Sequence, residues 1–227
     1  MPAHSPPTHV VKILDTSFIT HNVICFKVQK PKGFTYTPGQ ATLLAPNEEE
    51  WRDRAAPFSF TSLSSSRTLE FLIKIYPERR GLTHRLGLAR KGSELLIGEP
   101  FGAIAYHGPG YFFAGGSGVT PFISILRTLH KEHRIQGHTL VCSNQTASDI
   151  ILDAELTRMM GKNFLNFLTR QHVIGFAERR IDRNTIVTLV QHFDQHFYIC
   201  GPRSFVANIG GILSDLGASA ESIVIEH

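Results

Sequence analysis

FFAGGSGVTPFISIL occupies residues 112–126 and constrains the fold more than any other stretch of the chain. An apolar run ends at Ala114, the turn GGSG follows at 115–118, and a second apolar run begins after Pro121. This pattern predicts a buried strand, a tight glycine turn, and a helix with Thr120 as its cap and Pro121 in its first turn. Such a turn lets a ligand approach the backbone, and the N–H groups of the helix start attract phosphate. The spacing differs from the dehydrogenase pattern G-x-G-x-x-G, so an ordinary strand-to-helix turn is the competing interpretation.

Strands and helices alternate through the rest of the C-terminal half. Further strands are predicted at 139–143, 164–168, 196–200 and 222–225, and helices at 121–132, 150–160, 186–193 and 204–216. This alternation is typical of a doubly wound α/β fold with a parallel sheet, which binds ligands at the carboxyl ends of its strands.

The N-terminal half has the pattern of β structure. Strand-like stretches, separated by turns, lie at 10–14, 23–27, 41–45, 58–62, 69–76 and 94–98. One short helix is expected at 84–89, with Thr83 as its cap. Many short strands with regular turns indicate an antiparallel β-barrel or a sandwich, and we predict the barrel. The chain is therefore expected to hold two domains, residues 1–107 and 108–227.

The composition is that of a globular protein rather than a membrane protein. Of the 227 residues, 42% are hydrophobic and 19% are charged, and no apolar run approaches the ~18 residues of a membrane span. The N-terminal stretch has no signal-peptide core, and the three cysteines lie far apart in the sequence. We therefore expect a cytoplasmic protein with reduced thiols and no membrane span.

The net charge of +4 comes from the first half of the chain. Residues 1–107 hold 13 Lys and Arg against 9 Asp and Glu, whereas residues 108–227 hold 10 of each. The densest basic cluster comprises Arg79, Arg80, Arg85, Arg90 and Lys91. It suits phosphate groups or an acidic partner, with a solvated surface as the alternative. Interleaved aromatic residues are missing from the cluster, so no nucleic-acid partner is expected.

APFS at residues 56–59 is the first of several motifs that share one family pattern. It resembles the flavin motif R-x-Y-S of the ferredoxin–NADP reductase superfamily of flavin-dependent reductases, and the resemblance extends from about Val11 to the end of the chain. It implies that Pro57 and Phe58 bind the cofactor, with Phe58 against the flavin ring, and that Ser59, as a catalytic residue, forms a hydrogen bond near the reactive ring nitrogen. Ala56 replaces the family arginine, and Arg54 could compensate from the same face of the strand. A plain core strand is the alternative.

IKIY at 73–76 and GLT at 81–83 continue the resemblance. In the family, a strand of this kind and the following helix start hold FAD. Strand alternation puts Lys74 and Tyr76 on one face, and N–H groups at a helix start suit a pyrophosphate. The FAD contacts implied by these two segments are Ile73, Lys74, Tyr76, Gly81, Leu82 and Thr83.

Three motifs of the second half resemble the segments that bind the nicotinamide nucleotide in this family. The first is GGSGVTP at 115–121, which implies nucleotide contacts for Gly115, Gly116, Ser117, Gly118, Thr120 and Pro121. The second is SNQT at 143–146, followed by DIIL, which implies contacts for Ser143, Asn144, Gln145 and Thr146. The third is CGP, which implies contacts for Cys200, Gly201 and Pro202.

Cys200 and Glu226 complete the predicted catalytic set. By resemblance, Cys200 lies near the nicotinamide carbon that gives up hydride, although strand-end cysteines are commonly buried for packing alone. Glu226 could approach the flavin, with a plain surface carboxylate as an equal alternative. The 12 histidines lack metal-ligand spacing, so no metal site is expected.

Together the motifs predict an FAD-dependent oxidoreductase that takes hydride from NADH or NADPH and passes electrons to a separate acceptor, such as a soluble ferredoxin, flavodoxin or cytochrome. We expect NADH to be preferred, because Gln145 and its neighbours are uncharged; Arg170 is the residue that could favour NADPH. No cysteine cluster for an iron–sulfur centre is visible. The family resemblance suggests a monomer. The alternatives are a free-flavin or quinone reductase, and a non-catalytic flavin-binding electron-transfer subunit.

Overall fold

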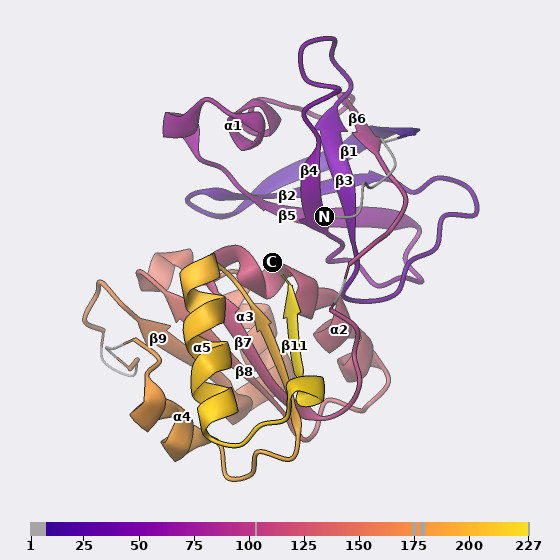
Figure 1. Cartoon of the computed structure of the whole chain (residues 1–227). Helices are drawn as coiled ribbons and strands as arrows, with labels where there is room; N and C mark the ends of the chain where they lie inside the picture. The colour runs from indigo at the N-terminus through magenta and orange to yellow at the C-terminus, as the bar shows by residue number, and fades with distance from the viewer. Residues whose placement is uncertain (1–7, 103, 174–175, 178–179, 227) are drawn as a thin grey trace.

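The computed structural model of the chain describes residues 8–102, 104–173, 176–177 and 180–226. The backbone forms two halves, each built on one β-sheet, with the N-terminal half stacked on the C-terminal half (Figure 1). Among the described residues, no helix combines the length and the hydropathy needed to cross a membrane.

The N-terminal sheet is antiparallel and strongly curled. Its strands are β1 (His9–Thr20), β2 (Val23–Gln29), β3 (Ala41–Pro46), β4 (Ala56–Ser59), β5 (Thr68–Lys74) and β6 (Glu94–Ile97), in the order β4-β3-β6-β1-β2-β5. The edges approach each other where the N–H of Thr61, just beyond β4, donates to the carbonyl of Glu70 in β5 at 2.9 Å. The antiparallel barrel prediction is confirmed in its architecture, but the sheet is not closed.

Helix α1 (Leu82–Gly87) packs against this sheet and starts earlier than predicted. Gly81 is its N-cap residue, and the carbonyl of Gly81 accepts the N–H of Arg85 at 3.0 Å. Thr83 lies inside the first turn, so the prediction that it caps the helix is wrong. Gly81, with its extended backbone, already occupies the N-cap position, so Thr83 is the second residue of the helix.

The C-terminal sheet is parallel. Its strands are β7 (Gly110–Gly115), β8 (His138–Asn144), β9 (Phe164–Leu168), β10 (His196–Cys200) and β11 (Ile223–Glu226), in the order β11-β10-β7-β8-β9. Consecutive residues of β7 point to opposite faces, as strand geometry requires. Phe112 packs toward α2 (Thr120–Lys131) and α3 (Asp153–Met160), whereas Phe113 packs toward α4 (Arg183–Leu189) and α5 (Arg203–Asp215). The predicted doubly wound parallel sheet is confirmed.

Two helices of this half begin elsewhere than the sequence pattern indicated. Helix α3 starts at Asp153 rather than at 150, because Thr146 and Asp149 form a capping box on a short 3-10 turn and Leu152 has a left-handed backbone (φ 53°). Helix α4 starts at Arg183 rather than at 186, because the Asp182 carboxylate accepts the N–H of Thr185 at 2.8 Å. A side-chain hydrogen bond sets the start of α4, whereas the left-handed backbone of Leu152, after the capped turn, sets the start of α3.

Tyr198 anchors the connection between the two sheets. Its buried hydroxyl accepts the N–H groups of His107 and Gly108, both at 3.0 Å, and donates to the Gly108 carbonyl at 2.8 Å. Tyr198 therefore fixes the backbone of residues 107–108, just before the chain enters β7.

His138, at the start of β8, is buried with both ring nitrogens engaged. Nδ1 lies 3.0 Å from the Ile135 carbonyl and Nε2 lies 2.9 Å from the Tyr106 hydroxyl. The carbonyl can only accept, so the proton of the neutral ring is on Nδ1, and Nε2 accepts from Tyr106. Burial lowers the pKa of His138 below its usual value.

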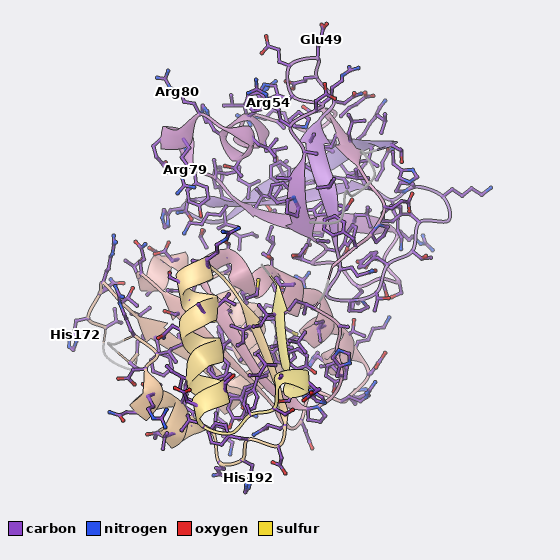
Figure 2. All side chains as sticks on the ribbon, in the orientation of Figure 1. Glu49, Arg54, Arg79, Arg80, His172 and His192 are labelled. Atoms are coloured by element: carbon purple, nitrogen blue, oxygen red, sulfur yellow. The ribbon has the colours of Figure 1, made fainter. Side chains whose placement is uncertain are left out.

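We expect this group to make stability depend on pH. Because the folded pKa is lowered, the unfolded chain binds more protons at mildly acidic pH. The contribution is therefore complete above the unfolded pKa of about 6.5 and is lost as the pH falls below it. Urea unfolding followed from pH 7 to pH 5 should show a decline that is shallower in His138→Asn, whose amide can still donate to Ile135. His192→Gln, an exposed histidine (Figure 2), is the control and should leave the slope unchanged. An identical slope in the native chain and in His138→Asn would contradict the assignment.

Candidate active site

The carboxyl ends of β7 and β10 meet where the strand order of the parallel sheet reverses. From β7 the chain continues outward through β8 and β9, then returns to β10 and β11 on the other side of β7. Gly115 ends β7, Cys200 ends β10, and Ala114 is the register partner of Cys200. Open parallel sheets bind ligands in the crevice at this position. The glycine turn at residues 115–118 and the CGP segment at residues 200–202 therefore lie together.

The two loops pack backbone against backbone. A Cβ atom on Gly118 would lie 2.3 Å from the Cys200 carbonyl oxygen and 2.7 Å from the Gly201 Cα. One on Gly201 would lie 3.0 Å from the Gly115 Cα. Gly116 differs: its φ is +54°, and no described atom lies within 4 Å of the position that a Cβ would occupy. The loop is thus closed toward Cys200 and open at Gly116, where a ligand can approach the backbone.

The glycine loop leads into α2 through a 3-10 turn, η2 (Gly116–Val119). Thr120 does not cap the helix as predicted, because Val119 is the N-cap residue and the Thr120 hydroxyl donates to the Ser117 carbonyl at 3.0 Å. Pro121 lies in the first turn, as predicted. Among the described residues no side chain caps this helix start, and the positive end of the helix dipole suits an anion, although the Thr120 N–H donates to the Ser117 carbonyl and Pro121 has no N–H.

The predicted ribose segment, residues 143–146, comprises the last two residues of β8 and the first two of the loop after it, at the same edge of the sheet. Ser143 pairs with Gly115, Gln145 is exposed, and Asn144 is buried. The Gln145 carbonyl accepts the N–H of Arg170 at 2.9 Å. Arg170, which follows β9, therefore lies beside this segment, with its side chain exposed.

A cleft of about 510 Å³ separates this loop from the barrel. The barrel side is formed by the β1–β2 turn and the end of β5, including His21, Lys74 and Tyr76; Gln145, Thr146 and Asp149 line the other side. Lys74 Nζ lies 3.5 Å from Asp149 Oδ1. Burial opposes ionisation of Asp149, but hydrogen bonds from Thr146 and the charge of Lys74 outweigh it and lower the pKa of this carboxyl. Asp149 and Glu78 are charged groups of this cleft that the sequence analysis did not assign to the site.

The predicted flavin motif lies on β4, at the edge of the barrel sheet. Ser59 pairs with Ala41 and Phe58 with Thr42. Pro57 is exposed, and Phe58 and Ser59 are half-buried, so their side chains are accessible. Arg54 is exposed, with its guanidinium 5.1 Å from the centroid of the Trp51 ring.

The predicted pyrophosphate segment runs from β5 to α1. Ile73 is buried, Lys74 faces the cleft, and Gly81, Leu82 and Thr83 form the start of α1. The guanidinium of Arg79 lies 4.5 Å from the centroid of the Tyr76 ring. Figure 2 shows Arg54, Arg79 and Arg80 at the α1 end of the barrel. A helix start without a side-chain cap and several cations therefore occur together at this end.

The remaining predicted site residues are Cys200 and Glu226, and cysteine, acidic and histidine side chains are also the possible metal ligands. Cys200 is half-buried at its strand end, whereas Cys25 and Cys142 are buried inside the sheets. The backbone of Glu226 pairs with Cys200 at the end of β11, but its side chain falls outside the described part of the structure. Within the described ranges, no group of three or more His, Cys, Asp or Glu side chains could hold a metal ion.

Comparison with known proteins agrees with this arrangement. Residues 112–210 match the family model of the oxidoreductase NAD-binding domain. The chain is 27% identical over 194 residues to an NADPH oxidoreductase of Mycobacterium tuberculosis (82% of this chain, 50% of the relative). It is 30% identical over 156 residues to NADH–cytochrome b5 reductase 1 of Arabidopsis thaliana (64% of this chain, 54% of the relative).

A solved structure shares the whole fold. The crystal structure of a ferredoxin NADP+ reductase from Neisseria gonorrhoeae superposes with a TM-score of 0.82 at 21% identity, covering 96% of this chain and 97% of the other. The chain spans about half the length of several curated relatives that it matches. The matched domain is that of the oxidoreductase NAD-binding family, and the whole chain has the two-domain fold of this ferredoxin NADP+ reductase.

Proposed function

We propose that the chain is a flavoprotein reductase that binds FAD on the barrel, takes hydride from NAD(P)H bound on the parallel sheet, and passes electrons to a separate acceptor. The observation that carries this proposal is the meeting of the glycine loop and the Cys200 segment at the reversal of strand order, beside an uncapped helix start. The proposal divides the chain into a flavin domain, residues 1–107, and a nucleotide domain, residues 108–227.

The barrel residues fit a flavin dinucleotide. Phe58 and Pro57 offer apolar surface to a flat ring, and the Ser59 hydroxyl can form a hydrogen bond at the ring edge. The N–H groups of Gly81–Thr83 suit the pyrophosphate, and Arg54 offers a cation at the same end of the barrel. Bound FAD would supply the chemistry that this chain lacks, which is acceptance of a hydride and release of electrons singly or in pairs.

The parallel sheet fits the nicotinamide nucleotide. In the proposed arrangement the diphosphate lies at the start of α2 over Gly116, and the adenosine ribose lies at Gln145 and Thr146. Cys200 offers a small polarizable side chain to the nicotinamide ring. The role of Glu226 as a catalytic acid stays a prediction.

The decisive experiment is to express the chain, supply FAD and add NADH or NADPH without oxygen. We expect a yellow protein whose visible flavin absorbance is bleached by the nucleotide. Acid release of the flavin followed by chromatography should recover FAD. Recovery of FMN alone would contradict the pyrophosphate assignment, and a chain that stays colourless with FAD would contradict the proposed function.

We also propose that the electron acceptor is a redox protein. Relatives named as a cytochrome b5 reductase and as electron-transfer components of dioxygenases support a redox protein, such as a ferredoxin, flavodoxin or cytochrome. We propose a cytoplasmic monomer. If the pure enzyme reduces free FMN or a soluble quinone faster than any of these proteins, the alternative of a free-flavin or quinone reductase is favoured.

We expect NADH to be used in preference to NADPH, as kcat/KM measured at fixed ionic strength. The ionised carboxyl of Asp149 faces the cleft beside Gln145 and would repel a 2′-phosphate. Arg170 opposes this preference, because its backbone adjoins Gln145. Gln145→Arg should shift the ratio toward NADPH. A clear NADPH advantage in the native chain, abolished in Arg170→Ala, would overturn the prediction and assign the 2′-phosphate to Arg170.

We also expect the basic cluster to speed reduction of an acidic acceptor. The structure leaves Arg80 and Lys91 exposed, whereas Arg85 is paired with Glu48 (Nε to Oε2 2.7 Å) and Arg90 donates to the Gly87 and Ala89 carbonyls. An Arg80→Gln/Lys91→Gln variant should reduce an acidic ferredoxin several-fold more slowly at low salt, and the difference should vanish at high salt. Arg134→Gln, an exposed arginine on the other half, is the control. Acceptor reduction that does not respond to ionic strength would contradict the docking role.

A further inference from the structure

One face of α2 contacts the barrel. Three of its side chains, spaced three and four residues apart and so on the same side of the helix, reach across to the N-terminal half. The contacts are Ser124 with the N–H of Gly39 at 3.0 Å, Arg127 with Thr61 and Glu70, and Lys131 with Ser65 at 3.3 Å. Helix α2 is therefore the element of the nucleotide half that is attached to the flavin half along its length.

Arg127 is the centre of this interface. Its Nη1 donates to the Thr61 carbonyl at 2.8 Å and to Glu70 Oε1 at 2.6 Å, while Nε and Nη2 donate to the Glu155 carboxylate at 2.6 and 2.9 Å. The side chains of Arg127 and Glu70 are 17% and 15% exposed, so the pair is shielded from water. Four hydrogen bonds in one plane fix the guanidinium in a single orientation.

Arg127 and its partners lie close in the sequence to two segments of the proposed active site, the flavin motif and the glycine loop. Thr61 lies two residues after Ser59, and its hydroxyl also donates to Glu70 Oε1 at 2.9 Å. Helix α2 starts where the glycine loop ends, and Arg127 lies seven residues after Thr120, about 10 Å along the axis. One rigid side chain thus connects the strand of the flavin motif to the helix that follows the nucleotide loop.

We infer that Arg127 is a positioning residue for hydride transfer: it sets the separation between the Ser59 segment and the glycine loop. This inference rests on the proposed function. The other two contacts of α2 do not fix geometry in the same way, because Ser124 accepts one neutral hydrogen bond and Lys131 is exposed. A lysine at 127 would keep the charge but lose the planar fork, since an ammonium cannot hold three partners in one plane.

The test compares Arg127→Lys and Glu70→Gln with the native protein, all fully loaded with FAD. Stopped-flow reduction by NADH or NADPH should be about 10-fold slower in Arg127→Lys, the scale expected of a small misplacement of reacting groups, and several-fold slower in Glu70→Gln. The dissociation constant of the nucleotide should change less than twofold, because the nucleotide contacts remain. The deuterium isotope effect from C4-labelled nucleotide should increase. Arg134→Lys, an exposed arginine beyond the end of α2, is the matched control and should leave the rate unchanged.

The outcomes separate the two proposals. A native chain that holds FAD but is not reduced by either nucleotide overturns the proposed function and the positioning role with it. A native chain that is reduced, with Arg127→Lys within twofold of it at full FAD loading, overturns the positioning role alone. Hydrogen exchange gives a readout that does not depend on activity: amides of residues 60–62 should exchange faster in Arg127→Lys and unchanged in Arg134→Lys. Unaltered exchange there would also overturn the inference.

Discussion

Gly118→Ala is expected to lower the free energy of unfolding by about 3 kcal/mol, the upper part of the range for overpacking. The added methyl would stand 2.3 Å from the Cys200 carbonyl oxygen and 2.7 Å from the Gly201 Cα. These are backbone atoms of a strand end held between two neighbouring strands, so they cannot move aside as a flexible side chain would. Urea denaturation followed by circular dichroism measures the loss.

Gly211→Ala is the matched control for this substitution. Gly211 lies inside α5, and no described atom approaches within 4 Å of where its Cβ would stand. Alanine is favoured over glycine by about 0.5–1 kcal/mol in a helix, so this variant should be slightly more stable than the native chain. A Gly118→Ala variant as stable as the native chain would show that the two loops are not packed as described. We also expect Gly118→Ala to weaken nucleotide binding, because the backbone atoms of Cys200 and Gly201 that the added methyl would displace lie beside the proposed nucleotide site.

Ser59→Ala is expected to slow reduction of the bound flavin by NADH about 100-fold while leaving the unfolding transition nearly unchanged. The reason lies in the proposed role of its hydroxyl, since a preorganised donor at a site of developing charge is worth about this factor. The half-buried position of Ser59 on an edge strand makes the change sterically mild. Stopped-flow spectroscopy at full FAD occupancy gives the rate directly.

Phe58→Ala should act differently from Ser59→Ala. Loss of the aromatic stack is expected to weaken FAD binding by about 0.5–1.5 kcal/mol beyond the lost apolar area, with a smaller effect on the rate once FAD is bound. Ser17→Ala, the same change as in Ser59→Ala but at an exposed position of β1, should change neither property. Hydride transfer at the native rate in Ser59→Ala, with FAD bound, would refute its catalytic assignment.

Strands and helices whose apolar residues recur at a regular spacing could be predicted from the sequence. The exact starts of helices, which depend on particular local contacts, could not. Phe112 and Phe113 mark a strand buried on both faces, and α5 was predicted within one residue of each end. The starts of α1, α3 and α4 depend on Gly81, on the Thr146–Asp149 capping box and on Asp182. The Thr146-x-x-Asp149 and Asp182-x-x-Thr185 spacings were signals that the sequence analysis could have used, whereas Gly81 left no such signal.

For the candidate site, local motifs were informative and contacts between the halves were not. The glycine loop could be found because a tight turn at a strand end leaves a compositional mark, and the CGP segment could be found because it resembles a family motif. Nothing in the sequence brings Lys74 to Asp149, or Arg127 to Thr61 and Glu70, because these pairs depend on how the barrel sits on the parallel sheet. In the sequence, Arg127 is indistinguishable from an ordinary polar residue on the exposed side of an amphipathic helix.

The unequal burial of the three cysteines gives the protein an intrinsic chemical probe. Burial, together with the nearby Glu70 carboxylate, raises the pKa of the Cys25 thiol to about 12, and burial raises the pKa of Cys142 as well. Because only a thiolate reacts with an alkylating reagent, both are protected by pKa as well as by packing. Cys200 ends β10 beside the glycine loop, with part of its surface exposed. A reagent such as iodoacetamide should therefore modify Cys200 first, and the rate of this modification reports occupancy of the crevice without any engineered label.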